Sequence, residues 1–535
     1  MREEALFLRK SSGLVRTWGI IDAFIYNASM APPLMQAAYV WSLAAFWPTS
    51  NIILAILLMT IFEIFHAIYY SGVISTMPRA GGEYVWTTRL LSAPLGFCIV
   101  FTGWLVVLPV WIPVIVANIT QQSIAPLFYI AGNTGTANWV WTNDGLFVLT
   151  LINIVYSFLA CAFGMKLYSR IQKIIFPLAI IGTIVAIISF ALATPENFVT
   201  KLNSFYHDTL GYPTTNFYQD TIDAATGAGL AMEWNWDVGQ ALPLIPLLAY
   251  YGIWGVWSAP LMGEVRQADR MNKVLGGLLA ASVPINLLGL VFLLPVLRLV
   301  GFNFYTSGNW LWWMADIAHA PIPPAPGLWL YLVTGSVPLA FFVLFFNAWT
   351  ALHFNGGGNG YLAVSRMMFA MSFDRMLPSW FASLSTKFRV PMVSMIWTAI
   401  LATIYGWLYA YDIRILEVGF RVLFLDGVIV LVFGFISTAI IAVILPYKRR
   451  QLWEASTASK WTSIIQGSAL IYLGFLGMLL YYYVVDPLYG SNNPTSALFL
   501  GTTYILGIIT YVAFRYYRKS QGIDMSKLYG TIPVE

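Results

Sequence analysis

The sequence predicts an all-α polytopic membrane protein with twelve transmembrane helices. Of its 535 residues, 59% are hydrophobic and only 10% are charged, whereas a soluble domain averages roughly 25% charged residues. Apolar runs long enough to cross a bilayer, which takes ~20 residues in a helix, recur along the whole chain. The sequence shows no nucleic-acid-binding patch, metal-binding cluster, phosphate loop or catalytic triad. We therefore expect neither an enzyme nor a cofactor.

The apolar runs set the expected order of the helices. They lie at about 16–43, 50–76, 94–123, 145–164, 170–193, 240–262, 273–300, 328–371, 392–411, 419–446, 462–486 and 495–516. The eighth run is too long for one crossing, so its cytoplasmic end is expected to continue past the bilayer.

The distribution of basic residues predicts the orientation. With the N-terminus inside, 24 of the 28 Lys and Arg residues lie on the cytoplasmic side, and only Lys201, Arg298, Arg414 and Arg421 lie outside. Cytoplasmic loops of membrane proteins carry this excess. We therefore expect both termini in the cytoplasm, a location in the plasma membrane, and larger outside loops at about 124–144, 194–239 and 301–327.

The first apolar run is interrupted near its middle by Tyr26-Asn27-Ala28-Ser29-Met30-Ala31-Pro32-Pro33. Consecutive prolines remove two backbone donors and bar the preceding residues from helical geometry. Because lipid cannot satisfy the freed carbonyls, such a break persists only where it is buried or lines a cavity. N–H groups beyond Pro33 favour a carboxylate there, and carbonyls ending near Asn27 favour an ammonium group or a cation. A proline kink in a packing helix is the alternative.

A second interruption lies at Tyr250-Tyr251-Gly252-Ile253-Trp254-Gly255-Val256-Trp257-Ser258-Ala259-Pro260. Two interrupted helices in corresponding positions of two halves indicate the substrate site of a secondary transporter. Trp254 is expected to wall the cavity, although core packing or interface anchoring is the commoner role of a membrane tryptophan. The predicted substrate-binding residues are Tyr26, Asn27, Ala28, Ser29, Met30, Tyr251, Gly252, Trp254 and Gly255.

Four motifs lie in order at predicted helix–loop junctions. They are Gly13-Leu14-Val15-Arg16 leading to Asp22, Met77-Pro78-Arg79-Ala80-Gly81-Gly82-Glu83-Tyr84-Val85-Trp86, Gly263-Glu264-Val265-Arg266, and Ser365-Arg366 followed by Ala370-Met371-Ser372-Phe373-Asp374-Arg375-Met376-Leu377-Pro378. Together they resemble the motifs of amino acid–polyamine–organocation (APC) superfamily permeases over at least residues 13–391. The family's Gly-x-Gly in the first helix is absent, and Ala179 stands where some proton-coupled relatives have a lysine.

The resemblance implies a LeuT-like fold and transport by alternating access. Helices 1–5 and 6–10 would form inverted repeats with broken helices 1 and 6, and two peripheral helices would follow. The implied regions are 1–193 (N-terminal tail and first repeat), 194–239 (extracellular loop), 240–446 (second repeat) and 447–535 (helices 11 and 12 with a cytoplasmic tail). Substrate would lie between the broken helices, while a homo-oligomer or another membrane partner is left open.

Ionisable residues within the spans are candidates for coupling or gating. Glu63 and His66 lie three residues apart on one face of helix two and would form either a structural pair or a shared proton site. His353 and Asp426 are expected nearer the cavity. Asp22 and Glu264, at cytoplasmic helix ends, are expected to pair with Arg79, Arg89 or Arg366.

Two amides, Asn355 and Asn359, flank three glycines in the predicted helix eight. They are candidates for lining the site or a cation position, and the glycines permit close helix packing. The resemblance implies that sodium sites of this fold prefer hydroxyls in helix eight, and this run has none. Proton coupling is therefore favoured over sodium coupling.

Neither broken segment contains an acidic or basic residue. A polyamine site would need buried carboxylates to offset the desolvation of several ammonium groups. We therefore expect a neutral amino acid with a medium or large apolar side chain. The alternatives are a polyamine or organic-cation transporter, an amino acid exchanger, and a non-transporting subunit that keeps the permease fold.

Overall fold

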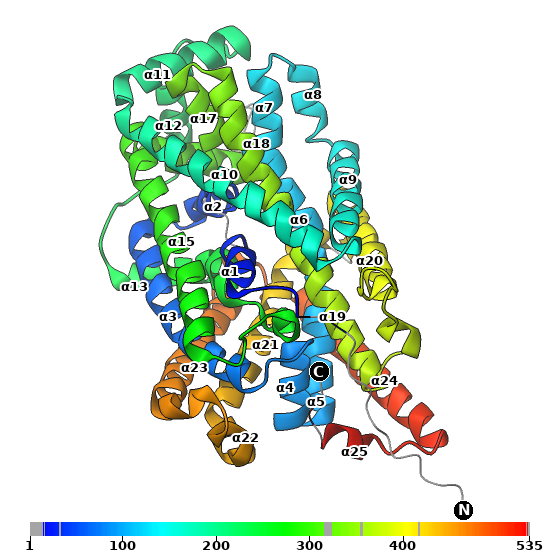
Figure 1. Cartoon of the computed structure of the whole chain (residues 1–535). Coiled ribbons are helices and arrows are strands. Elements are labelled where there is room, and N and C mark those ends of the chain that lie inside the picture. The colour runs from blue at the N-terminus through cyan, green and yellow to red at the C-terminus, as the bar shows by residue number, and fades with distance from the viewer. Residues whose placement is uncertain are drawn as a thin grey trace, which may run out of the picture.

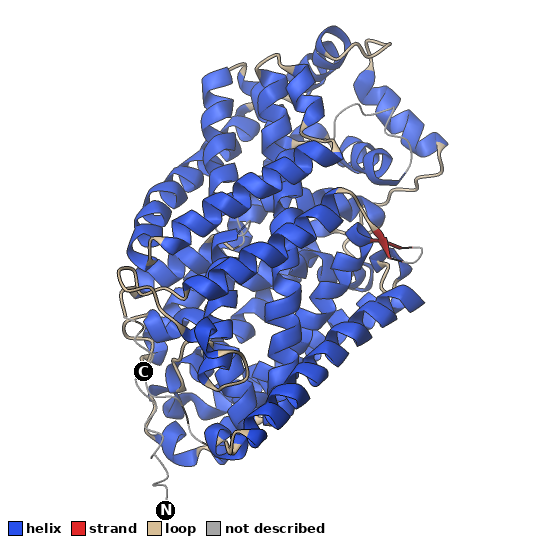
Figure 2. Ribbon diagram, turned by 90° about the vertical axis from the view of Figure 1, so that its right-hand side faces the viewer, coloured by secondary structure: helices blue, strands red, loops and turns tan. Residues whose placement is uncertain are grey.

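The computed structural model describes residues 14, 16–30, 34–314, 324–353, 357–415, 418–530 and 532. Helices form nearly all of the regular structure in this part of the chain. One short antiparallel pair of strands, β1 (Arg414–Ile415) and β2 (Val418–Gly419), lies just before the helix that begins at Phe420 (Figure 2). The predicted all-α membrane class is confirmed.

Nine continuous helical runs in the described residues are long and apolar enough to cross a membrane. They are α3 (Ile52–Thr76), the run Ala93–Ile130, α9 (Asn143–Ala162), α10 (Met165–Leu192), α15 (Met271–Val300), α20 (Met392–Ala410), α21 (Phe420–Lys448), the run Thr457–Val485, and α24 (Pro494–Ser520). The run Ala93–Ile130 contains α5 (Ala93–Val100), α6 (Trp111–Ile119) and α7 (Ala125–Ile130), and the run Thr457–Val485 contains α23 (Thr462–Val485). The predicted first, sixth and eighth spans are divided into pieces.

The first and sixth spans are both interrupted where the sequence predicts a break. The first holds α1 (Ile20–Ala28) and α2 (Met35–Ser42). The sixth holds α14 (Ile245–Gly252) and the 3₁₀ helices η7 (Ile253–Val256) and η8 (Ala259–Glu264), and its two halves are bent by 51°. The prolines Pro32 and Pro33 lie outside the described residues.

The eighth span is shorter than its predicted range of 328–371. A separate helix, α17 (Pro326–Thr334), ends at Gly335, whose φ of +64° closes the turn in a conformation that favours glycine. The span then runs through α18 (Val337–His353) and α19 (Asn359–Phe373). The prediction of one overlong helix is wrong at its start.

Short helices occupy the regions predicted to be extracellular loops. They are α8 (Thr134–Trp139), α11 (Pro195–Ser204), α12 (Phe217–Gly227), α13 (Val238–Ala241) and α16 (Phe302–Met314). In Figure 1, α8, α11 and α12 lie at the end opposite α4 (Gly82–Leu90), α22 (Arg450–Glu454) and α25 (Met525–Tyr529). The region 194–239 is thus built largely of helices rather than loose chain.

Several contacts join helices that are five apart in the order of spans. The second and seventh spans pack together as α3 and α15, and the fourth and ninth as α9 and α20. Pieces of the first and sixth spans also meet, because α1 contacts η7 and α2 contacts α14. Such contacts are those expected of two five-helix repeats related by a two-fold axis. The two interrupted helices therefore lie against each other.

Candidate functional site

A hydrogen bond joins the two interrupted helices. The side-chain amide of Asn27, in the last turn of α1, donates to the hydroxyl of Ser258, which lies between η7 and η8 (3.2 Å). Asn27 Oδ1, the Ser29 hydroxyl and the Tyr26 hydroxyl are buried without a hydrogen-bond partner in the described chain. Buried polar atoms are nearly always paired. These three atoms are therefore available to a guest molecule.

A small cavity of about 30 Å³ lies beside this junction. Its walls come from the first, third, sixth and eighth spans, through Met30, Leu108, Trp111, Ile112, Ile115, Trp254, Trp257, Asn359 and Gly360. A single water needs roughly 10–15 Å³ by this measure, so the space holds one or two waters and no amino acid. The site is closed in this structure.

Stacked tryptophans give the cavity a stiff wall. The rings of Trp104 and Trp257 stack with their centroids 4.7 Å apart, and Trp254 meets Trp257 edge-on at 5.6 Å. Phe435 of α21 closes the cluster against Trp104 and Trp254. Each such aromatic pair contributes ~0.5–1.5 kcal/mol beyond its buried area. The cluster therefore holds the interrupted sixth span against the third.

Some predicted site residues line the cavity and others pack elsewhere. Met30, Trp254 and Asn359 line it, and Ala28 is fully buried in α1. A Cβ at Gly252 would meet the Met59 side chain of α3 at 2.3 Å, and one at Gly255 would meet Ser282 Cα of α15 at 2.9 Å. These two glycines therefore allow close helix packing. The Tyr251 side chain and the whole of Asn355 lie outside the described residues.

The loop motif between the second and third spans reaches the sixth span. A buried carboxyl, Glu83 of α4, accepts hydrogen bonds at Oε1 from the indole N–H of Trp257 (2.7 Å) and from the Tyr70 hydroxyl. Its Oε2 is buried and has no partner in the described chain. Burial raises the pKa of Glu83 from 4.5 to about 7. Glu83 is not among the site residues predicted from the sequence, where its only signal is an acid inside a motif with two glycines.

Those two glycines bring the loop against its neighbours. Gly81 has a φ of +77°, and its N–H donates to the Pro260 carbonyl of η8 (3.0 Å). A Cβ there would meet the Ala370 Cβ at 2.5 Å, and one at Gly82 would meet the Ala259 backbone at 2.5 Å. Only glycine permits both contacts. Loop, sixth span and eighth span thus form one packed unit.

Ion pairs close the end of the molecule predicted to be cytoplasmic. Glu264 accepts two hydrogen bonds from the guanidinium of Arg366, at 2.7 and 3.3 Å, as predicted for this acid. Asp22 pairs with Lys173 (2.8 Å) and accepts from Ser169. Asp22 was expected to pair with Arg79, Arg89 or Arg366, and this expectation is wrong because Lys173 and Ser169 lie beside it on α10.

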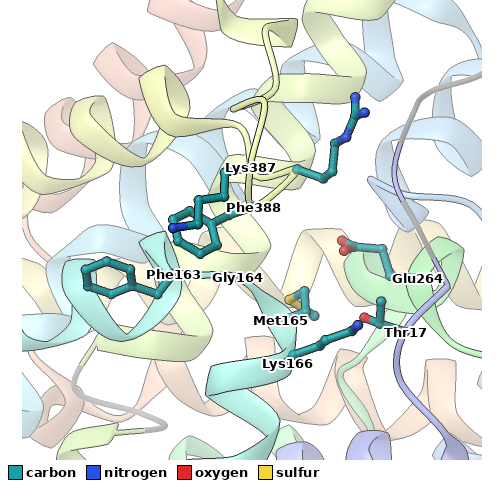
Figure 3. Close-up of a pocket in the computed structure, with 9 residues that line it drawn as sticks. Thr17, Phe163, Gly164, Met165, Lys166, Glu264, Lys387 and Phe388 are labelled. Atoms are coloured by element: carbon teal, nitrogen blue, oxygen red, sulfur yellow. The ribbon is translucent and has the colours of Figure 1, made fainter.

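A second cavity, the vestibule, lies next to the Glu264–Arg366 pair. It has a volume of about 230 Å³ and is lined by Thr17, Phe163, Gly164, Met165, Lys166, Glu264, Lys387, Phe388 and Arg389. Figure 3 shows Glu264 facing it beside Thr17, with Lys166 and Lys387 around its edge. The vestibule is far larger than the central cavity, and the two share no lining residue.

Two other groups of candidates lie away from the cavity lining. Glu63 contacts the Nδ1 of His66 (3.1 Å) and accepts from Tyr472 of α23 (3.0 Å). His353 contacts the hydroxyl of Tyr156 (2.8 Å), and its ring stacks on Tyr168.

Tyr168 in turn donates to Asn359 Oδ1 (2.9 Å), which connects His353 indirectly to the cavity wall. Asp426 is buried in α21 beside Ser491 and Ser496 and does not line the cavity.

Two interrupted helices that meet at a closed central cavity, in a multi-pass membrane domain with a vestibule at one end, define a membrane transport protein. A family model described as amino acid permease matches residues 23–514. The chain therefore belongs to the amino acid permease family and is a secondary transporter rather than an enzyme.

Comparison with the curated proteins gives no match. Among solved structures, the chain is similar to MhsT in complex with L-phenylalanine. The two are 13% identical, the match covers 85% of this chain and 97% of that chain, and the TM-score is 0.48.

Proposed function

We propose that the protein moves a neutral amino acid with a medium or large apolar side chain across the plasma membrane, together with a proton. The observation that carries the substrate class is the lining of the central cavity, which contains six aliphatic or aromatic side chains, Met30, Asn359 and Gly360 but no carboxylate or cation. Such a wall suits an apolar side chain and leaves a polyamine without a counter-charge.

The charged ends of the amino acid would meet the junction of the broken helices. The Tyr26 and Ser29 hydroxyls and Asn27 Oδ1 are buried there without partners. Oxygen acceptors at a helix C-terminus, where the dipole is negative, suit an ammonium group. Entry of the substrate requires the walls of the cavity to move apart, because the present cavity is too small. Alternating access supplies that movement, with the vestibule as the cytoplasmic opening.

Ligand-dependent thermal stabilisation of the purified protein tests the substrate class. L-leucine and L-phenylalanine are expected to raise the melting temperature, while putrescine and spermidine are not. At 100 times the dissociation constant, a ligand stabilises the folded state by ~2.7 kcal/mol. Trp254→Leu should abolish the shift, and Trp407→Leu, on an exposed part of α20, should keep it.

Stabilisation by polyamines alone would contradict the proposed substrate. The exchanger alternative predicts uptake into proteoliposomes only when the lumen is preloaded with amino acid. A symporter takes up substrate into empty vesicles when an inward proton gradient is applied. Both termini are proposed to lie in the cytoplasm, on the side of the vestibule.

A further inference from the structure

We propose that Glu83 is the group that carries the coupled proton. It would be protonated while α4 packs on the sixth span and would release the proton to cytoplasmic water when that packing opens. This inference rests on the proposed function, because it assigns the proton of that transport cycle to one residue. The loop motif that contains Glu83 lies outside the membrane spans, and Glu83 is not among the coupling or gating residues predicted from the sequence.

The first support is the position of the carboxyl. Glu83 is 1% exposed, and one of its two donors, Trp257, lines the closed cavity. Trp257 lines the central cavity and binds Glu83 Oε1 through its indole N–H (2.7 Å). Tyr70 donates from α3 to the same oxygen. A change in the charge of Glu83 therefore acts directly on a wall of the cavity.

The second support is the lack of a counter-charge. No described residue forms an ion pair with Glu83, and its Oε2 has no partner among them. An ionised carboxyl in such surroundings is costly, so the closed form favours the neutral acid. Burial correspondingly raises the pKa of this group to about 7, close to the pH of a cytoplasm.

The other charged and titratable groups around α4 do not supply that counter-charge. The phenol of Tyr70 on α3 contacts Glu83, and those of Tyr69 on α3 and Tyr26 on α1 lie near it. The surrounding ionic groups have other partners: Arg366 of α19 with Glu264 of η8, Arg89 of α4 with Asp374, and Lys448 of α21 with the Leu90 carbonyl. These three cations are thus bound elsewhere.

The third support links release of the Glu83 proton to opening of the cytoplasmic side. The 3₁₀ helix η8 lies between Trp257 and the vestibule, with Glu264 at its far end facing the vestibule. It holds the loop through the bond from Gly81 N–H to the Pro260 carbonyl and through the contact of Gly82 with Ala259. Displacement of η8 toward an open vestibule would break these contacts and admit water to Glu83. The proton would then leave with the opening of the cytoplasmic side.

The alternative carriers lack one of these properties. Glu63 has both oxygens engaged, by His66 and by Tyr472, and contacts no residue of the cavity lining. His353 reaches the cavity only through Tyr168 and Asn359. Asp426 lies beside Ser491 and Ser496 near the start of α24.

The test uses the full chain in proteoliposomes, with radiolabelled L-leucine as the probe. Wild type should take up L-leucine several-fold faster under an inward proton gradient than at equal pH. Glu83→Gln should lose this acceleration while it keeps L-leucine exchange between preloaded vesicles and medium. Glu454→Gln, an exposed acid paired with Arg450, should behave as wild type. An unchanged gradient response in Glu83→Gln, or its loss in Glu63→Gln alone, would overturn the proposal.

A second measurement separates this inference from the proposed substrate. The tryptophan fluorescence of the wild type without any amino acid should change with a midpoint near pH 7, because Trp257 donates to Glu83. This transition should be missing in Glu83→Gln and should persist, shifted, in Glu83→Asp. If L-leucine neither binds nor moves but the transition is present, the substrate proposal fails and the proton site stands. If the wild type shows no such transition, the proton site is overturned whatever the substrate.

Discussion

The amide of Asn27 and the hydroxyl of Ser258 lie 3.2 Å apart, and this hydrogen bond spans 231 positions of the chain to join the two interrupted helices. Both side chains are buried at about 1% exposure. The contact uses only the Nδ2 of Asn27 and leaves its Oδ1 for a guest. One residue therefore closes the junction and, under the proposed function, would also bind the substrate.

Asn27→Leu should lower both the stability of the folded protein and its affinity for L-leucine. It leaves the buried Ser258 hydroxyl without its donor, which costs ~1–3 kcal/mol of stability. It also removes Oδ1, so the thermal shift with L-leucine should disappear. Ser258→Ala, by contrast, should lower the melting temperature while it keeps most of the ligand shift. Calorimetry with and without ligand checks both, and an equal loss of ligand shift in the two variants would contradict the separation.

Breaking the Glu264–Arg366 pair should open the vestibule side. Removing one partner of a buried ion pair leaves an uncompensated charge and costs ~3–5 kcal/mol. A cysteine placed at Ser29 should therefore react faster with a water-soluble thiol reagent in the Arg366→Gln variant than in the parent. The two native cysteines should add little background, because both are buried. Lys173→Gln is the matched control. Because Lys173 is half exposed in its pair with Asp22, its loss should cost under ~1 kcal/mol and leave labelling unchanged.

The raised pKa of Glu83 predicts a pH dependence of stability. A carboxyl with a folded-state pKa of about 7 against a reference of 4.5 holds its proton more tightly in the folded chain. Its contribution is fully present below pH ~4.5 and is lost as pH rises through about 7. The difference is at most on the order of 3 kcal/mol. Melting curves should show a steeper loss between pH 5 and 8 in wild type than in Glu83→Gln, and parallel curves would contradict this.

Alanine at Gly81 or Gly82 should disrupt the packed loop. A Cβ at either glycine would lie 2.5 Å from atoms of Ala370 or Ala259, and Gly81 also has a positive φ. Overpacking and backbone strain of this kind cost ~1–3 kcal/mol each. Gly467→Ala in α23, where a Cβ meets nothing within 4 Å, should be neutral or stabilising by up to ~1 kcal/mol. Denaturation of the purified variants compares the three.

The helix order could be predicted because bilayer thickness imposes one length on every span. The two central interruptions could also be predicted, because proline and glycine at that depth have few structural outcomes. Short helices such as α11 and α17 could not, since only two residues separate α11 from the end of α10, and the apolar sequence of α17 runs almost directly into α18. Their structure depends on packing against neighbouring helices, such as α10, α15 and α18.

The site was less predictable, for reasons that particular residues illustrate. Trp254 and Met30 line the cavity because they flank the breaks. Gly252 and Gly255 flank the sixth-span break as well, yet they pack against α3 and α15. Whether a residue at the break faces the cavity or a neighbouring helix depends on the tertiary arrangement. Glu83 sits in a short helix between two spans, where an acid is usually solvated. Its burial depends on contacts with Tyr70, on the preceding span, and with Trp257, which is distant in the sequence.

The central cavity of about 30 Å³ bears on how any ligand will be recognised. A molecule that binds there selects a minor, expanded population, so its apparent affinity equals the intrinsic affinity reduced by the fraction of that population. Observed association rates should therefore level off at high ligand concentration, at the rate of expansion. An antibody fragment that holds the expanded form would tighten the binding of every substrate by the same factor.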